Sequence, residues 1–169
     1  GGHSVARRSD GSAVAWGDNN ANQTSVPALP PGLRYVQIAA GGEHTLLRRS
    51  DGSVVARGRN TEGQRSVPAL PAGLTYISIG AGWQHSLAVR SDGSCVAWGS
   101  NEYHQCEVPA PPPGYSYVQV AGGAFHSVAL LAPTQVCLTF DFETEDDFVT
   151  PLGNGQKIDT EFGRLVRIS

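Results

Sequence analysis

Residues 82–99 read GWQHSLAVRSDGSCVAWG, and this stretch decides the fold. It starts at a glycine, continues as a short apolar segment, turns at Ser91–Ser94 (SDGS), and ends in a second apolar segment that closes with Trp98 and Gly99. Asp and Gly in such a turn supply a side-chain-to-backbone hydrogen bond and a positive φ, which are typical of a tight β-hairpin. The stretch therefore predicts two antiparallel strands.

The same pattern occurs twice before this stretch, at residues 1–17 and 41–58. One histidine per copy recurs at an interval of 41 residues, in the series His3, His44, His85 and His126. The same interval separates the aspartates of the turns, which are Asp10, Asp51 and Asp92. A fixed period of about 40 residues is typical of stacked supersecondary units, and the blades of β-propellers are in this range.

The rest of each unit also has the character of a β-protein. The segments 35–39 and 76–79 alternate and are rich in β-branched and aromatic residues, which predicts a further strand before each hairpin. A polar loop follows the hairpin, and its sixth position (Asn22, Gly63 and His104) has residue types that tolerate a left-handed backbone. A proline-rich segment then closes the unit as an edge or a connector. No stretch has a helical period of useful length, so the predicted fold is all-β.

These units predict a partial β-propeller, with blades at 1–40, 41–81 and 82–122 and a closing strand at 123–132. Pro133 stands where the hairpin aspartate belongs, and we interpret the last strand as one that completes the sheet begun by the N-terminus. Residues 133–169 are expected to be the start of a second, truncated β domain. Because the smallest propellers have about four blades and the sequence has no methionine, we expect a piece of a longer protein.

Composition excludes several classes of function. The net charge of −3 over 169 residues offers no electrostatic basis for binding nucleic acid. No apolar run approaches the roughly 18 residues of a membrane span. The three cysteines, Cys95, Cys106 and Cys137, do not have the spacing of a metal site. A disulfide between Cys95 and Cys106 is one alternative, and free thiols are the favoured one.

The motif G-x-x-H-[ST]-x-x-x-x-S-D-G-S-x-x-x-W-G-x-N-x-x-G-Q, most complete at Gly82–Gln105, resembles the repeat of the regulator of chromosome condensation family. The resemblance covers residues 1 to about 132, and the second repeat departs from it by carrying Arg57 where the others have Trp16 and Trp98. The unit is similar in length to compact bacterial versions, such as the propeller-type β-lactamase inhibitor. The resemblance implies a propeller of seven blades whose loop rims bind other proteins.

The tail after residue 132 has its own, shorter resemblance. Its TFDFETEDDF segment and NGQ turn resemble the start of β-sandwich modules of bacterial secreted or surface proteins. Strands are predicted at Val136–Phe142 and Phe162–Ile168, with a turn at Leu152–Gln156. The acidic run Asp141–Asp147 offers oxygen ligands of the kind calcium takes. It lacks the spaced pattern of a calcium loop, so a solvated acidic surface is favoured.

The evenly spaced histidines raise the question of a metal or catalytic site, and their spacing argues against one. Zinc needs all its ligands about 2 Å from one ion, whereas consecutive blades are farther apart than that. We interpret each histidine, with its neighbouring Ser or Thr, as a structural hydrogen-bonding pair between a strand and the adjacent turn. The aspartates of the SDGS turns are interpreted as turn formers. No catalytic residue, cofactor or metal is predicted.

Positions that vary between the copies are free of the scaffold and are therefore the candidates for function. They lie just before each histidine and in the polar loops, and the candidate partner-binding residues are Glu43, Trp83, Gln84, Phe125, Arg59, Glu62 and Tyr103. Trp and Tyr are over-represented among binding hot spots. The alternative interpretation of the aromatic residues is packing between blades.

The leading hypothesis is a non-enzymatic propeller that binds another protein through one rim. We expect it to be part of a larger bacterial protein that is secreted or exposed at the cell surface. One alternative is an exchange factor for a small GTPase. Such a factor inserts a loop into the nucleotide site, and no copy here has an insertion longer than the repeat. Another alternative is carbohydrate binding, which the rim aromatics would suit.

Overall fold

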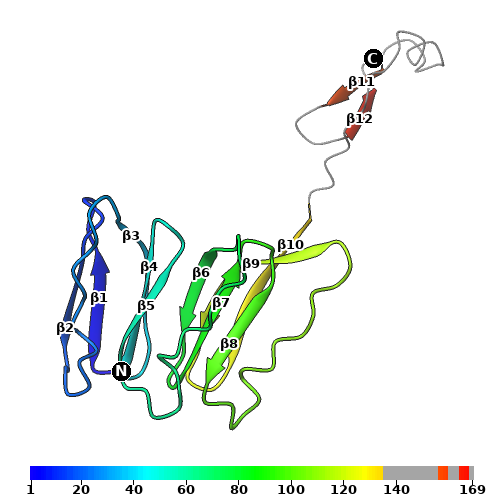
Figure 1. Ribbon diagram of the computed structural model, residues 1–169. Coiled ribbons are helices and arrows are strands. Elements are labelled where there is room, and N and C mark those ends of the chain that lie inside the picture. Colours follow the sequence, from blue (N-terminus) through cyan, green and yellow to red (C-terminus); the bar gives the residue numbers. More distant parts are fainter. Residues whose placement is uncertain (135–155, 160–163, 168–169) are drawn as a thin grey trace. The chain divides into compact units, whose positions relative to one another are not determined.

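The computed structural model describes residues 1–134, 156–159 and 164–167 (Figure 1). By its contacts the chain divides into two units, Gly1–Thr134 and Gln135–Ser169. The described residues form strands and turns without a helix, so the all-β prediction is confirmed. Among them there is accordingly no helix that is long and apolar enough to cross a bilayer.

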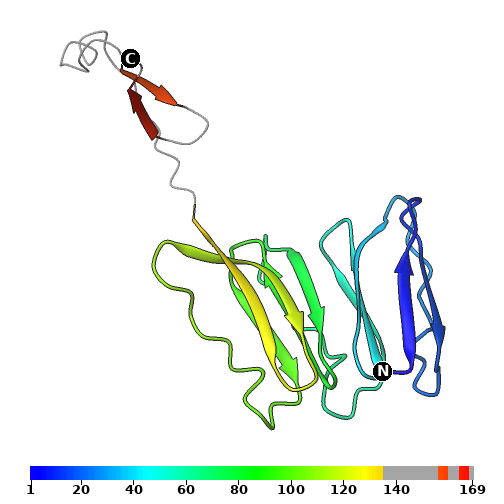
Figure 2. The same cartoon turned by 180° about the vertical axis from the view of Figure 1, so that it is seen from behind.

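The first unit consists of small antiparallel sheets that follow one another along the chain and stand side by side (Figures 1 and 2). The N-terminal sheet pairs β1 (His3–Arg7) with β2 (Ala13–Gly17), and the last sheet pairs β9 (Tyr115–Gly122) with β10 (Ser127–Pro133). Between them lie two three-stranded sheets, β3 (Tyr35–Ala40), β4 (His44–Arg49) and β5 (Val54–Gly58), then β6 (Tyr76–Ala81), β7 (His85–Arg90) and β8 (Cys95–Gly99). Every pairing is antiparallel, as the hairpin motif predicts.

The SDGS turns form for the predicted reasons. The backbone N–H of Ser94 donates to the Asp92 carboxylate at 2.9 Å, and the same bond recurs in the other two copies. The hydroxyl of Ser94 donates to the same carboxylate at 2.7 Å, and this bond, followed by the backbone bond, lowers the pKa of Asp92. Gly93 has a φ of +80°, and a Cβ added there would lie 2.5 Å from Cβ of Ser116. The turn thus requires glycine both for its backbone conformation and for space.

The polar loops have the predicted left-handed residue. The φ angles are +63° at Asn22, +80° at Gly63 and +61° at His104. The glutamine that follows closes each loop, because its side-chain oxygen accepts the backbone N–H two residues earlier. These pairs are Ala21 with Gln23, Glu62 with Gln64, and Tyr103 with Gln105.

The proline-rich segments are connectors without strand structure, as predicted. Each one is held by a tyrosine at or near the start of the next sheet. The hydroxyl of Tyr76 donates to the carbonyl of Pro68 at 2.8 Å, and the other copies repeat this bond. The connector therefore needs no ladder hydrogen bonds of its own.

The core lies between the sheets rather than within one of them. One buried cluster joins the sheets of β4 and β7, and its members are Leu46, Tyr76, Ile79, Ala88 and Trp98. The next cluster joins the sheets of β7 and β10, and its members are Leu87, Val89, Tyr117 and Val120. A two-stranded sheet is marginal alone, and the buried side chains of these sheets are covered by the neighbouring sheets, so each one depends on its neighbours.

A buried hydrogen-bond relay accompanies the apolar contact between the sheets. His44 Nε2 lies 2.9 Å from the Ser86 hydroxyl of the next sheet, and that hydroxyl donates to the carbonyl of Gln64 at 2.8 Å. Because the hydroxyl proton goes to the carbonyl, Nε2 of His44 must carry its own proton and act as the donor. The equivalent triplets are His3, Thr45 and Gln23, and His85, Ser127 and Gln105. The hydroxyl partner thus comes from the following repeat, and not from the residue beside the histidine.

Two features differ from the sequence interpretation. The sheets do not coincide with the predicted blades 1–40, 41–81 and 82–122, because β3 lies at the end of the first range and pairs with β4 in the second. The predicted closing strand forms as β10 but pairs with β9, in a sheet separate from β1 and β2. It therefore does not complete the N-terminal sheet in this structure. The reason is that β10 is the second strand of its own sheet and pairs with β9, as β4 pairs with β3 and β7 pairs with β6.

Cys95 and Cys106 are free thiols, which was the favoured interpretation, and the alternative of a disulfide between them is wrong. Cys95 begins β8 and packs against the cluster between the last two sheets, where burial raises the pKa of its thiol to about 11. Cys106 lies in the polar loop beyond the other end of β8, with its thiol 3.3 Å from the carbonyl of Ser100. The strand therefore separates the two sulfur atoms.

The second unit is described only where β11 (Gln156–Asp159) pairs antiparallel with β12 (Arg164–Arg167). The predicted strand at Phe162–Ile168 contains β12. The predicted strand Val136–Phe142 and the acidic run Asp141–Asp147 lie outside the described residues.

Candidate protein-binding rim

The loops before the histidines and the polar loops meet at one end of the sheets, which we call the rim (residues 41–43, 82–84 and 123–125 with 18–22, 59–63 and 100–104). Backbone hydrogen bonds join the two kinds of loop. Arg59 N donates to the carbonyl of Glu43 at 2.8 Å, and Ser100 N donates to that of Gln84 at 2.9 Å. The variable positions of the two loops are therefore neighbours on one surface.

The rim of the second sheet carries an ion pair. A guanidinium nitrogen of Arg59 lies 2.7 Å from the carboxylate of Glu43, and about half of each side chain is exposed. Arg59 also donates to the Thr61 hydroxyl at 3.1 Å, which fixes its orientation. An exposed pair of this kind contributes little to stability, because solvent screens the two charges. Its charges are available to a partner.

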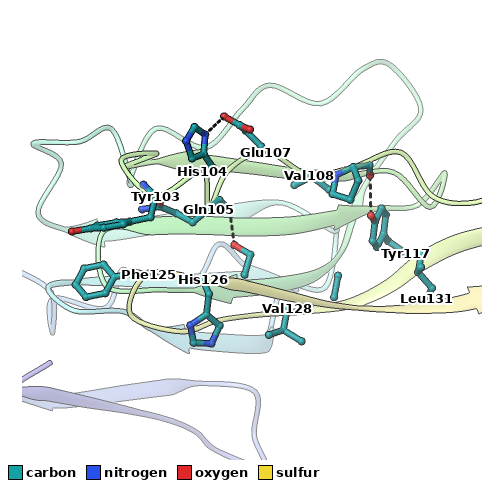
Figure 3. Close-up of a pocket in the computed structure, with 13 residues that line it drawn as sticks. Tyr103, His104, Gln105, Glu107, Val108, Tyr117, Phe125, His126, Val128 and Leu131 are labelled. Carbon is teal, nitrogen blue, oxygen red and sulfur yellow. Dashed lines mark hydrogen bonds and ion pairs between the residues drawn. The ribbon is translucent and has the colours of Figure 1, made fainter.

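The rim of the last two sheets is aromatic (Figure 3). Tyr103, from the loop after β8, and Phe125, from the loop before β10, have ring centroids 5.0 Å apart with a tilt of 51°. The two rings remain 58% and 54% exposed. They contact each other across two sheets, and still present most of their surface to solvent. Packing between blades therefore explains only part of their area.

Trp83 lies between the loop of Phe125 and the loop of Glu43, because its backbone N–H donates to the carbonyl of Gly123 at 3.2 Å and its carbonyl accepts from Gly42. The backbone N–H of Gly42 donates to the carbonyl of Trp83 at 3.1 Å, and a Cβ on Gly42 would lie 2.9 Å from the indole. The indole thus rests on the glycine next to Glu43 and remains 46% exposed. Glycine at position 42 makes this close approach possible.

The structure places all seven candidate residues on the rim, but not all in one cluster. It brings together Glu43 with Arg59, and Tyr103 with Phe125. Gln84 is half-buried, and its carbonyl bonds the polar loop. Glu62 is exposed, at the position that Tyr103 has in the next repeat.

Sequence reasoning missed one pair in this region. His104 Nδ1 lies 2.7 Å from the carboxylate of Glu107, and both side chains are exposed. The hydrogen bond to Glu107 raises the pKa of His104. The available signal was Glu107 itself, because the other two copies have Ser25 and Ser66 at that position.

The histidine–serine contacts do not form a nucleophile with its base. A general base accepts the proton of the hydroxyl, whereas here the Ser86 hydroxyl donates to the Gln64 carbonyl and the histidine donates to the hydroxyl. Ser86 and His44 are also fully buried. Within the described part of the chain, no three His, Cys, Asp or Glu side chains are placed to bind a metal ion.

The sequence repeat belongs to a known type. Residues 35–64 and 76–105 match the model of the Regulator of chromosome condensation (RCC1) repeat. Each match begins at the first residue of a three-stranded sheet and includes the polar loop that follows it. A repeat of the family therefore begins where a sheet begins. The chain carries RCC1 repeats, and the resemblance is confirmed at this level. No curated protein matches the sequence.

Solved structures show the same fold. Prp20p from Saccharomyces cerevisiae is similar with a TM-score of 0.68 and 22% identity, over 79% of this chain and 42% of that one. Human WBSCR16 has a TM-score of 0.64 and 20% identity, over 76% of this chain and 42% of that one. The ectodomain of the Arabidopsis thaliana receptor kinase ACR4 has a TM-score of 0.52 and 24% identity, over 78% and 43%. The chain thus has an RCC1-type propeller architecture and spans less than half the length of these proteins.

Proposed function

We propose that this chain is a non-enzymatic protein-binding module and that the rim is its binding surface. The observation that carries the proposal is the exposed aromatic surface of Trp83, Tyr103 and Phe125. Large aromatic side chains that project from loops on a rigid scaffold supply contact area at a low cost in conformational entropy. Such side chains are typical anchors of protein interfaces.

The surroundings of the aromatic surface support this proposal. Trp83 rests on Gly42, next to the exposed ion pair of Glu43 and Arg59. An apolar centre with charged residues at its border is the usual composition of a protein interface. Electrostatic complementarity to the border would set the orientation of the partner.

Similar proteins provide a second line of support. The Prp20p structure is described together with its binding properties to Gsp1p and histones. Another structure shows Kap60 bound to yeast RCC1, with a TM-score of 0.67 and 23% identity. Protein binding is therefore a use to which this architecture is put, and we extend that use to the present chain.

We also propose that the chain belongs to a larger bacterial protein that is secreted or exposed at the cell surface. The tail motif of residues 139–148 and the existence of similar ectodomains in receptor kinases favour this location. Protease treatment of intact cells tests it. Degradation of the protein from outside is expected, and protection from protease unless the cells are lysed would contradict it.

A comparative pull-down tests the binding proposal. The full chain and its variant Trp83→Ala/Tyr103→Ala/Phe125→Ala are used as baits, with Ile77→Ala as the control for loss of an exposed strand residue. Ile77 is 40% exposed and lies on β6, away from the rim. We expect one defined protein to bind the wild type and the control about tenfold or more tightly than the triple variant, because hot-spot residues carry such energies.

Two other outcomes would favour the alternatives. Nucleotide release from a small GTPase upon addition of the chain would identify an exchange factor. Binding to a defined glycan that is lost in Trp83→Ala would identify a carbohydrate-binding module. Either result in place of protein capture would overturn the proposal.

A further inference from the structure

The rim of the last two sheets combines exposed aromatic rings with carboxylates. Tyr103 and Phe125 contact each other, and more than half of each side chain is exposed. Glu102 precedes Tyr103 in the polar loop, Glu107 follows the loop, and both are exposed. The two rings and Glu107 line one groove (Figure 3). These four residues all lie outside β10, so the surface that they form does not depend on what pairs with that strand.

The carboxylate of Glu107 is held in place by its neighbours. His104 Nδ1 lies 2.7 Å from Oε1 of Glu107, and Asn101 Nδ2 donates to the same oxygen at 3.3 Å. These bonds, with that of His104 the larger, lower the pKa of Glu107, so the carboxylate is ionised at neutral pH. Its Oε2 has no hydrogen-bond partner among the described residues. One oriented acceptor oxygen is therefore open to a ligand.

No lysine or arginine of these two sheets neutralises the carboxylates. From Ser66 to Thr134 the sequence has a single Lys or Arg, which is Arg90. Arg90 ends β7 beside the SDGS turn, whereas the rim lies before the start of that strand. The second sheet differs in this respect, because Glu43 there is paired with Arg59. The rim of the last two sheets thus has a local excess of negative charge around its aromatic rings.

We propose that these four residues, which we call the acidic aromatic site (Glu102, Tyr103, Glu107 and Phe125), bind an arginine side chain of a partner protein. One guanidinium N–H donates to Oε2 of Glu107, and the plane of the guanidinium rests on an aromatic ring. The inference rests on the proposed function of the rim. It adds the chemistry of the partner, which is a basic surface centred on arginine.

Three physical effects favour arginine at this site. A cation over an aromatic face is attracted by the negative π surface of the ring. The guanidinium is planar and more weakly hydrated than an ammonium group, so arginine stacks better and loses less hydration than lysine. Its hydrogen bond to a carboxylate is charge-assisted. A carboxylate of an acidic partner would instead meet Glu102 and Glu107 as like charges, so the site also selects against acidic surfaces.

NMR titration of the full chain with the capped tripeptide Gly-Arg-Gly tests the proposal, with capped Gly-Gln-Gly as the neutral comparison. The titration is run at about pH 8, where an unprotonated His104 does not compete with the peptide for Glu107. We expect saturable shifts at residues 101–107 and 124–125, with a dissociation constant on the order of millimolar. The glutamine peptide is expected to bind about fivefold or more weakly, because it has no charge for the carboxylates or the rings.

Two double variants with the same change in charge locate the binding. Glu102→Gln/Glu107→Gln is expected to weaken the arginine peptide about fivefold or more. Glu43→Gln/Glu62→Gln removes the same charge from the rim of the second sheet. Its effect is expected to stay within about twofold in 0.1 M salt, because charges beyond about 10 Å are then screened. Phe125→Leu keeps an apolar side chain but has no π face, and about two- to fivefold weaker binding is expected.

Several results would overturn the proposal. They are the absence of saturable shifts at tens of millimolar peptide, equal binding of the two peptides, and equal weakening by the two double variants. Shifts that lie at the SDGS turns instead of the rim would also contradict it. A chain that captures a partner protein through its aromatic rim but does not bind the arginine peptide would refute the acidic aromatic site alone, and the proposed function would stand.

Discussion

At the scale of single residues, the repeated histidines and glycines are matched to each other. The backbone N–H of Gly82 donates to the carbonyl of His85, and a Cβ on Gly82 would overlap the His85 ring. The same arrangement holds for Gly41 with His44. The sequence could show that these residues recur together, but not that the imidazole lies against the glycine, because that contact depends on how the loop between β6 and β7 turns.

Gly82→Ala tests this contact. The added methyl group would overlap the buried imidazole of His85, which is hydrogen-bonded to Ser127. We therefore expect the free energy of unfolding to fall by about 2–3 kcal/mol. Gly73→Ala is the comparison, because Gly73 has a φ of +80° and open space around its Cα, where only backbone strain of about 1 kcal/mol applies. Urea unfolding measures both. A smaller loss at Gly82 than at Gly73 would contradict the packing role.

The buried histidines also predict a dependence of stability on pH. Burial lowers the pKa of His44 from 6.5 to about 4, with smaller contributions from His85 and His3. Its Nδ1 is buried and has no partner among the described residues, so an added proton there has no acceptor. The unfolded chain therefore binds more protons than the folded one between these two pH values. This contribution to stability is complete above about pH 6.5 and is lost as the pH falls toward 4.

Urea unfolding between pH 4 and 7 measures this effect. For His44 the expected loss is on the order of 3 kcal/mol, from about 1.4 kcal/mol per pKa unit. His44→Gln keeps an amide N–H that can donate to the Ser86 hydroxyl, and it cannot be protonated. The variant is expected to be less stable at pH 7 but to lose less stability on acidification. An equal loss in the variant and the wild type would show that other groups govern the acid response.

At the scale of elements, the strands and turns could be predicted from the sequence, but the sheets could not. The SDGS hairpins, the left-handed loop positions and the proline connectors follow from local chemistry, and all of them form. Strands β3 and β4 pair across the predicted boundary between two repeats. The sequence period gives the length of a repeat but not the residue at which a sheet begins, so it could not predict this pairing. The closing-strand error has the same origin.

The third strand of the sheet β6–β8 is predicted to be fixed by Trp98. Trp98 is 9% exposed and joins β8 to the preceding sheet through the carbonyl of Gln64. Trp98→Ala is expected to lower the free energy of unfolding by about 3–5 kcal/mol. Trp98→Phe keeps most of the apolar area but loses the indole donor, and we expect a smaller loss of about 1–2 kcal/mol. Thermal and urea unfolding distinguish these values, and equal losses would show that the hydrogen bond, not the packing, dominates.

At the scale of the whole first unit, the location of the variable loops was easier to predict than the contacts within them. The loops before the histidines and the polar loops lie on one rim, because backbone hydrogen bonds join them at the same end of the sheets. The Tyr103–Phe125 contact and the groove beneath it were not predictable, since they arise where two consecutive repeats meet. Residues of different repeats become neighbours only through the stacking of the sheets.

The two end sheets of the stack present apolar surface that the inner sheets bury. Trp16 on β2 is 55% exposed, whereas its counterpart Trp98 is 9% exposed. Val128 and Leu130 on β10 are 56% and 57% exposed, although Leu87 and Val89 at the same positions of β7 are almost fully buried. Exposed apolar surface of this kind favours association.

The two end faces are also complementary to each other. In every internal junction a histidine of one sheet bonds a Ser or Thr of the next, as His85 bonds Ser127. His126 and Ser4 have the corresponding positions on the two end faces, and both are exposed. A contact of β10 of one copy with β1 and β2 of another would repeat the internal junction. Such a contact is heterologous, so it would join copies head to tail.

We therefore predict that the isolated chain associates reversibly as its concentration rises. Sedimentation velocity over a range of micromolar concentrations measures the association. Val128→Glu/Leu130→Glu places two charges on one end face and is expected to give a monomer, because burial of an unpaired carboxylate is costly. Val36→Glu, on an exposed strand position of an inner sheet, is the control and should associate like the wild type. A wild type that is monomeric throughout, or a control that dissociates as completely as the double variant, would show that the end faces do not recognise each other.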